Sequence, residues 1–196
     1  MTYLTVVVFS LWAGSISEPP SLRELIISTL VVIWSLRLSV FLYSRIHRAG
    51  KDGRFDELKT SPIRFLVPWT IQGLWVFLTM IVVIVINSQN GSSPTLGIWD
   101  GIGMAVWILG FTIEVLADNQ KTAFNAVSEN KGKWIDSGLW SISRHPNYLG
   151  EILLWTGIAI FGISCLTGLE LLTWISPVFI YLLLTKVSGI PILDRR

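Results

Sequence analysis

The segment from Ser143 to Glu151 places five kinds of chemically active side chain where a polar loop meets an apolar run. It reads Ser143-Arg-His-Pro-Asn-Tyr-Leu-Gly-Glu151 and continues into the apolar residues 152–161. The segment therefore contains a guanidinium, an imidazole, an amide, a phenol and a carboxylate. Ionisable groups at the edge of a membrane helix are costly and usually serve a function there. The pattern predicts an active site in this segment.

The first residues of the helix that follows suit an anion. Pro146 is typical of a first helical turn, because it lacks an N–H that would stay unpaired there. The start of a helix carries partial positive charge and N–H donors, and Arg144 adds a guanidinium that can grip a phosphate with two hydrogen bonds. A pyrophosphate or a carboxylate would fit, but a capped helix beside an interfacial arginine explains the pattern equally well. His145 is open to three roles: proton donor, cofactor contact or cap.

Two polar stripes are expected to share one end of a helix pair. Glu114 and Asp118 are four residues apart, as are Asn147 and Glu151, with Trp155 one turn further on. Residues at this spacing lie on the same face of a helix. The stripes could line a polar cavity that opens to the cytoplasm, or the charged groups could pair with each other to hold the helices together.

Composition indicates that these helices lie in a membrane. Of 196 residues, 52% are hydrophobic and 14% are charged, and the mean hydropathy is +0.61. A soluble domain carries about 25% charged residues. The alternating strands of a membrane barrel are missing, so the fold class is expected to be all-α, a polytopic membrane helix bundle surrounded by lipids. A net charge of +2 without a basic helix argues against nucleic acid as a partner.

Six apolar segments are expected to form this bundle within a single domain, 1–196. They are 2–17, 22–43, 63–86, 98–117, 149–165 and 171–187. The first and the fifth are short for a bilayer span, which needs about 20 residues. Turn-forming residues separate the segments, among them Asp136-Ser-Gly138 and Thr167-Gly168.

Basic residues predict how the bundle is oriented. Thirteen of the fifteen lysines and arginines fall in or beside loops 44–62 and 118–147 and the C-terminal tail, whereas loops 87–97 and 166–170 have none. Basic loops stay in the cytoplasm. The predicted site therefore faces the cytoplasm, where soluble cofactors are available.

The motif also resembles a known family. Ser143–Glu151 is similar to the signature of the steroid 5-alpha-reductase-like membrane proteins, including the bacterial branch known as DUF1295. The likeness covers most of residues 20–196, through segments 34–39, 114–120, 131–140 and 186–196. Arg-His-Pro-x-Tyr-x-Gly also resembles isoprenylcysteine and phospholipid methyltransferases, but the lysine-rich loop and the Val-Ser-Gly-Ile-Pro tail favour the reductases.

The resemblance implies an enzyme that binds NADPH in a cytoplasm-facing cavity and reduces an activated carbon–carbon double bond in a small hydrophobic, lipid-like substrate. It implies that Asn147 contacts the nicotinamide end. The implied cofactor-binding residues are Arg37, Glu114, Asp118, Lys121, Arg144, His145, Asn147 and Trp155. Tyr148 or Glu151 is the expected catalytic proton donor, no metal is expected, and the implied location is a bacterial inner membrane.

Three departures from the reductase pattern keep two alternatives open. Trp34 stands where steroid reductases carry a substrate-binding tyrosine, their partner glutamate has no identified equivalent, and the chain stops at Arg196 where relatives continue with a basic tail. One alternative is a methyltransferase that uses S-adenosylmethionine on a lipid or thiol. The other is a truncated, inactive member of the family. The oligomeric state is not predicted.

Overall fold

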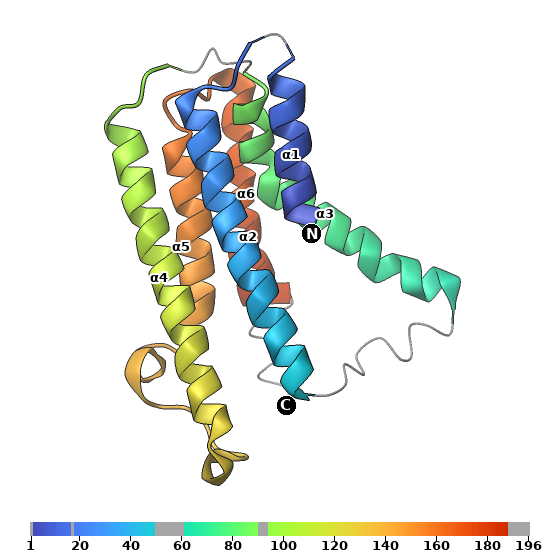
Figure 1. Ribbon diagram of the computed structural model, residues 1–196, viewed down its shortest axis with the longest axis vertical. Helices are drawn as coiled ribbons and strands as arrows, with labels where there is room; N and C mark the ends of the chain where they lie inside the picture. The colour runs from blue at the N-terminus through green and yellow to red at the C-terminus, as the bar shows by residue number, and fades with distance from the viewer. Residues whose placement is uncertain (1, 17, 50–60, 90–93, 188–196) are drawn as a thin grey trace. The chain divides into compact units, whose positions relative to one another are not determined.

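All regular structure in the described residues is helical. The computed structural model describes residues 2–16, 18–49, 61–89 and 94–187, and no strand occurs in these ranges, which confirms the all-α prediction. The main helices are α1 (Thr2–Gly14), α2 (Leu22–Ala49), α3 (Pro62–Asn87), α4 (Ile98–Ala126), α5 (Pro146–Phe161) and α6 (Ile175–Leu182) (Figure 1). Short helical turns are η3 (Ser128–Asn130), η4 (Gly138–Ser141), η5 (Gly168–Trp174) and the π-helical η6 (Leu183–Val187).

Within the described residues, four helical stretches are long and apolar enough to cross a membrane. They are Leu22–His47, Leu66–Asn87, Ile98–Ala126 and Gly168–Lys186. α1 has 13 residues and α5 has 16, so the first and fifth segments are short, as predicted. At 1.5 Å per residue α5 is about 24 Å long, less than the roughly 30 Å of a hydrocarbon core. These helices indicate a membrane protein.

Two helices extend well past the apolar segments that predict them. α2 runs to Ala49 rather than residue 43, and α4 runs to Ala126 rather than residue 117. Hydropathy marks how much of a helix suits lipid, whereas good helix formers such as lysine, glutamine and alanine can continue the helix into water. The extension of α4 has a consequence for the site, because it puts Lys121 on a helix rather than in a loop.

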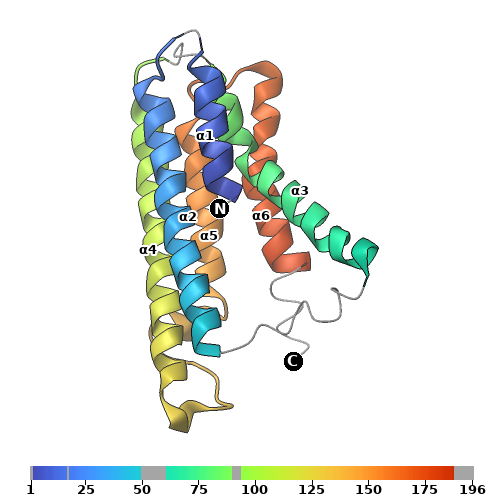
Figure 2. The same cartoon turned by 45° about the vertical axis from the view of Figure 1, so that its right-hand side comes forward.

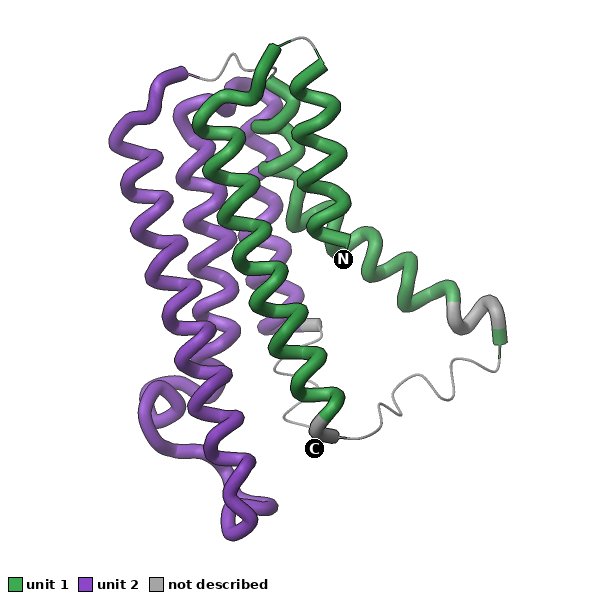
Figure 3. The backbone as a smooth tube through the Cα atoms, viewed as in Figure 1, with its two compact units in different colours: residues 1–93 green, residues 94–196 purple. Residues whose placement is uncertain are grey.

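The chain divides into two compact units, residues 1–93 and 94–196, which we describe separately (Figure 3). In the first unit α1 packs against both α2 and α3. The fully buried amide of Asn87, at the end of α3, donates hydrogen bonds to Ser10 Oγ at 2.8 Å and Ser28 Oγ at 3.0 Å. One side chain thus connects all three helices, as polar groups often do inside membrane bundles.

In the second unit α4 and α5 lie side by side along the length of α5 and form the most extensive contact in the chain (Figures 1 and 2). The contact is built on glycine. A β-carbon added to Gly110 would lie 2.6 Å from the Gly150 carbonyl oxygen, and one added to Gly157 would lie 2.8 Å from that of Gly103. Only residues without a side chain let two helix backbones approach this closely. α6 packs against α5.

Candidate functional site

The glycine contacts fix the register of α4 against α5. A β-carbon on Gly157 would lie 2.6 Å from the Trp107 nitrogen, and one on Gly150 would lie 2.6 Å from the Glu114 nitrogen. The helices are therefore antiparallel, with Glu114 level with Gly150. Continuing by one turn places Asp118 level with Pro146, the first residue of α5.

Glu114 and Asp118 are both buried at this end of α4. Their side chains are 3% and 6% exposed, and they lie one turn apart on the same face of the helix. A buried carboxyl group is costly unless polar groups surround it. Two such groups beside the start of α5 make this end of the pair the most polar part of the helix contact.

The first turn of α5 forms as the sequence predicts, with Pro146 at its start. The carbonyl of His145 accepts hydrogen bonds from the N–H groups of Tyr148 at 3.1 Å and Leu149 at 3.2 Å. Some of the backbone N–H groups at the start of α5 that could bind an anion are thus already hydrogen-bonded within the chain. The positive end of the helix and the exposed Arg144 side chain remain as the features that attract an anion.

Within the turn, the rings of His145 and Tyr148 stack, with centroids 5.2 Å apart and planes at 14°. The Oδ1 atom of Asn147 is buried and has no hydrogen-bond partner among the described residues. Glu151 is half-buried and Trp155 fully buried, each one turn further along α5. Because an unsatisfied buried acceptor costs free energy, the amide oxygen of Asn147 is suited to a ligand that brings an N–H.

The short helix η4 is fastened to α4 beside these carboxyl groups. The Trp140 indole N–H donates to the carbonyl of Ala117 at 3.0 Å, and the Leu139 N–H donates to Gln120 Oε1 at 3.0 Å. The ammonium of Lys121 lies 4.5 Å from the centroid of the Trp140 ring. Lys121, an expected cofactor contact, is thus held against an aromatic face.

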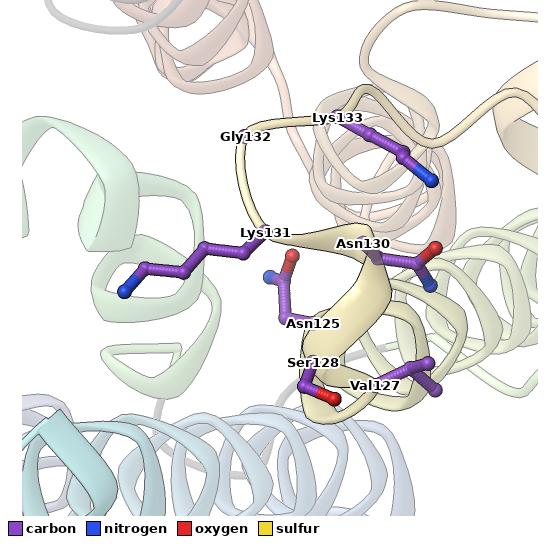
Figure 4. A pocket seen from close by; sticks show the side chains of 7 residues that line it. All are labelled: Asn125, Val127, Ser128, Asn130, Lys131, Gly132 and Lys133. Atoms are coloured by element: carbon purple, nitrogen blue, oxygen red, sulfur yellow. The ribbon is translucent and has the colours of Figure 1, made fainter.

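A separate cavity lies beyond the end of α4, and we call it the loop pocket (Figure 4). Its volume is about 380 Å³, and its lining residues are Asn125, Val127, Ser128, Asn130, Lys131, Gly132 and Lys133. None of the expected site residues lines it. In the sequence, its lysines count toward the basic loop and the family resemblance, but they are not predicted to form a pocket.

Arg37 is the one expected site residue outside the second unit. It lies on α2, half-buried, with its guanidinium carbon 5.2 Å from the centroid of the Phe41 ring. Its expected place near a cofactor stays a prediction.

Two features of the second unit were not predicted from the sequence. The first is the glycine contact between α4 and α5. The sequence feature that could have predicted it is the seven-residue spacing of Gly103 with Gly110 and of Gly150 with Gly157. Two helical turns separate such residues, so each pair lies on one stripe. The second is Trp140, whose indole N–H bonds to the Ala117 carbonyl of α4, a contact that depends on tertiary structure.

The fold and the polar end of α4 and α5 define a helical membrane protein with a candidate site at one end of a helix pair. The chain belongs to the family described as "Protein of unknown function (DUF1295)", whose model matches residues 2–196, and this confirms the family suggested by the motif. It is 26% identical over 184 residues to the uncharacterized protein C594.04c of Schizosaccharomyces pombe. That match covers 79% of this chain and 52% of the relative, so the chain spans about half the length of the relative. No solved structure matches.

Proposed function

We propose that this chain is a membrane-embedded reductase that uses NAD(P)H to reduce an activated carbon–carbon double bond in a lipid-like or steroid-like substrate. The observation that carries the proposal is the buried amide oxygen of Asn147. It lies in the segment that resembles the reductase signature, at the positive end of α5, which is level with two buried carboxyl groups of α4.

The residues present fit a nicotinamide dinucleotide. A nicotinamide carboxamide carries N–H donors that the Oδ1 atom of Asn147 can accept. The start of α5 and the guanidinium of Arg144 suit a pyrophosphate. The carboxylates of Glu114 and Asp118 can accept hydrogen bonds from hydroxyl groups of a sugar, which supports their proposed place in the nucleotide pocket.

The dinucleotide supplies the hydride when it is bound, and the chain supplies the proton and the positioning. Reduction of a double bond conjugated to a carbonyl adds hydride to one carbon and a proton to the other. The proposed donor of this proton is Tyr148 or Glu151. The stack of the Tyr148 ring on His145 limits the directions in which the phenol can point, which favours a fixed donor over a mobile one.

We further propose that the cofactor enters from the cytoplasm of a bacterial cell, at the end of the second unit where α4 ends and α5 begins. The support is the concentration of lysine and arginine in the loop that joins these helices. The membrane-embedded length of α4 and α5 would then bring the substrate to the hydride from the lipid side.

Calorimetric titration of the detergent-solubilised chain with NADPH and with S-adenosylmethionine tests this proposal. We expect saturable binding of NADPH, weakened on the order of tenfold by Asn147→Ala because a buried hydrogen bond to the ligand is lost. Asn119→Ala is the matched control, since Asn119 is exposed on the neighbouring helix α4.

Three other outcomes would contradict the proposal in whole or in part. Preference for S-adenosylmethionine would assign the chain to the methyltransferases that share its motif. Binding of neither compound would indicate a chain that keeps the fold without the chemistry. Equal NADPH affinity in the two variants would remove Asn147 from the cofactor site.

A further inference from the structure

The loop pocket is basic as well as polar. Its lining contributes two ammonium groups, two amides and one hydroxyl, and among the described residues that line it none carries a carboxylate. Two lysines on either side of one residue repel each other, and an anion between or beside them relieves that repulsion. The chemistry of the lining therefore favours an anionic ligand with several oxygen atoms.

Hydrogen bonds fix the backbone of this pocket. The Asn130 side-chain amide donates to the Phe124 carbonyl at 3.0 Å and ties the loop to the last turns of α4. The backbone N–H of Lys131 donates to the Ser128 carbonyl at 3.2 Å, and the backbone N–H of Lys133 donates to the Asn130 carbonyl at 2.9 Å. The two lysines thus extend from a defined turn rather than from a freely varying chain.

Gly132 makes the turn between the lysines possible. Its φ of +79° is in the left-handed region that favours glycine, and an added β-carbon would meet nothing within 4 Å among the described residues. Lys131 and Lys133 extend from the turn in opposite directions, with the Asn125 side chain near Lys131 (Figure 4). The space beside Gly132 is open and lysine stems are flexible, so either ammonium group can move toward a ligand in the pocket.

The position of the pocket relates it to the proposed cofactor site. Asn125 follows Asp118 by seven residues on the same helix, which is about 10 Å along the α4 axis. Since Asp118 is level with the start of α5, the loop pocket lies beyond that start, on the side away from the apolar core. A dinucleotide with its nicotinamide at Asn147 and its pyrophosphate at the start of α5 would extend its adenosine half in this direction.

We infer that the loop pocket binds a phosphate monoester, the 2′-phosphate on the adenosine half of the cofactor, through Lys131 and Lys133, and that it thereby selects NADPH over NADH. This inference rests on the proposed function. A phosphate monoester is dianionic and presents three acceptor oxygens, which match ammonium and amide donors. The same chemistry is offered by the headgroup of an anionic phospholipid, and the test separates the two sources.

The test titrates the full chain in detergent with NADPH and with NADH, in the wild type and in the Lys131→Ala/Lys133→Ala double variant. We expect the double variant to lose on the order of tenfold in NADPH affinity and to keep its NADH affinity. The loss should shrink as salt rises, because exposed charges are screened. Lys186→Ala is the matched control: it removes one exposed lysine of the same unit that does not line the pocket.

The outcomes distinguish this inference from the proposed function. If both nucleotides bind and the double variant keeps the wild-type ratio of their affinities, the inference is wrong and the reductase stands. If neither nucleotide binds the wild type, both the proposed function and this inference are wrong. A second arm measures binding of the chain in nanodiscs of neutral lipid to vesicles with and without phosphatidylglycerol. A loss in the double variant confined to anionic vesicles would assign the pocket to a headgroup and overturn the nucleotide assignment.

Discussion

Gly110 of α4 and Gly150 of α5 lie backbone to backbone. A β-carbon on Gly110 would be 2.6 Å from the Gly150 carbonyl oxygen, and one on Gly150 would be 2.7 Å from the Gly110 carbonyl oxygen. Because the contact is reciprocal, neither helix can slide along the other without losing it. The same contact holds Glu114 beside Gly150, so the register that packs the helices also sets the level of the candidate site.

Gly150→Ala is therefore expected to destabilise the second unit. The added methyl group has no space against the backbone of α4, and overpacking of this kind costs about 1–3 kcal/mol. Thermal unfolding of the detergent-solubilised chain, followed by circular dichroism, measures the effect as a lower Tm. Gly101→Ala is the control, since an added β-carbon there meets nothing within 4 Å among the described residues. Alanine at that exposed helix position should raise the stability slightly, because it favours the helix. Equal Tm values for the two variants would contradict the close contact.

Arg144→Ala is expected to weaken NADPH binding and leave the fold intact. The side chain is exposed, so its loss removes an anion contact rather than core packing. We expect on the order of tenfold lower affinity, and only partial recovery in Arg144→Lys, because an ammonium cannot form the paired hydrogen bonds of a guanidinium. Calorimetry measures the affinity, and Arg45→Ala, at an exposed position on α2, is the matched control. Full recovery by lysine would mean that only charge matters at this position.

The sequence predicts the local structure around the site well, because that structure depends on neighbouring residues. Pro146 starts α5, and the turn predicted at Asp136-Ser-Gly138 is present, with Gly138 at a φ of +60°. The turn predicted at Thr167-Gly168 likewise has Gly168 at a φ of +52°. Proline restricts the backbone φ angle and glycine permits positive φ values wherever they occur. Their effect can therefore be predicted without knowledge of the tertiary fold.

The rest could not be predicted, because it depends on contacts between distant segments. Hydropathy placed the end of the fourth segment at residue 117, whereas α4 continues to Ala126 and brings Gln120 within reach of Leu139. In the loop pocket, likewise, the Asn130 side chain bonds back to the Phe124 carbonyl at the end of α4. Apolar periodicity carries no information on such polar contacts, which depend on how the helices pack.

Trp140→Phe tests whether the η4 turn is fastened to α4 as the structure shows. Phenylalanine keeps an aromatic face for Lys121 but loses the indole N–H that donates to Ala117 at 3.0 Å. We expect a loss of about 1 kcal/mol, the usual net value of a buried hydrogen bond, measured as a lower Tm. Trp134→Phe is the control, since that side chain is 85% exposed. A larger loss in the control than in Trp140→Phe would mean that the turn is held by other contacts.

Asn87→Ala is expected to loosen the first unit. The side chain of Asn87 is fully buried and donates to Ser10 and Ser28, so alanine removes the link among three helices and leaves both hydroxyl groups without this donor. Hydrogen bonds inside membrane bundles contribute up to about 1–2 kcal/mol each. We therefore expect a lower Tm and faster hydrogen exchange in α1, which is short and packs through this end of the unit. Ser88→Ala provides the comparison, because the exposed Ser88 hydroxyl bonds only within its own turn, to the Val85 carbonyl at 2.7 Å. If α1 exchanges at the wild-type rate in Asn87→Ala, apolar packing rather than this amide holds the helix in place.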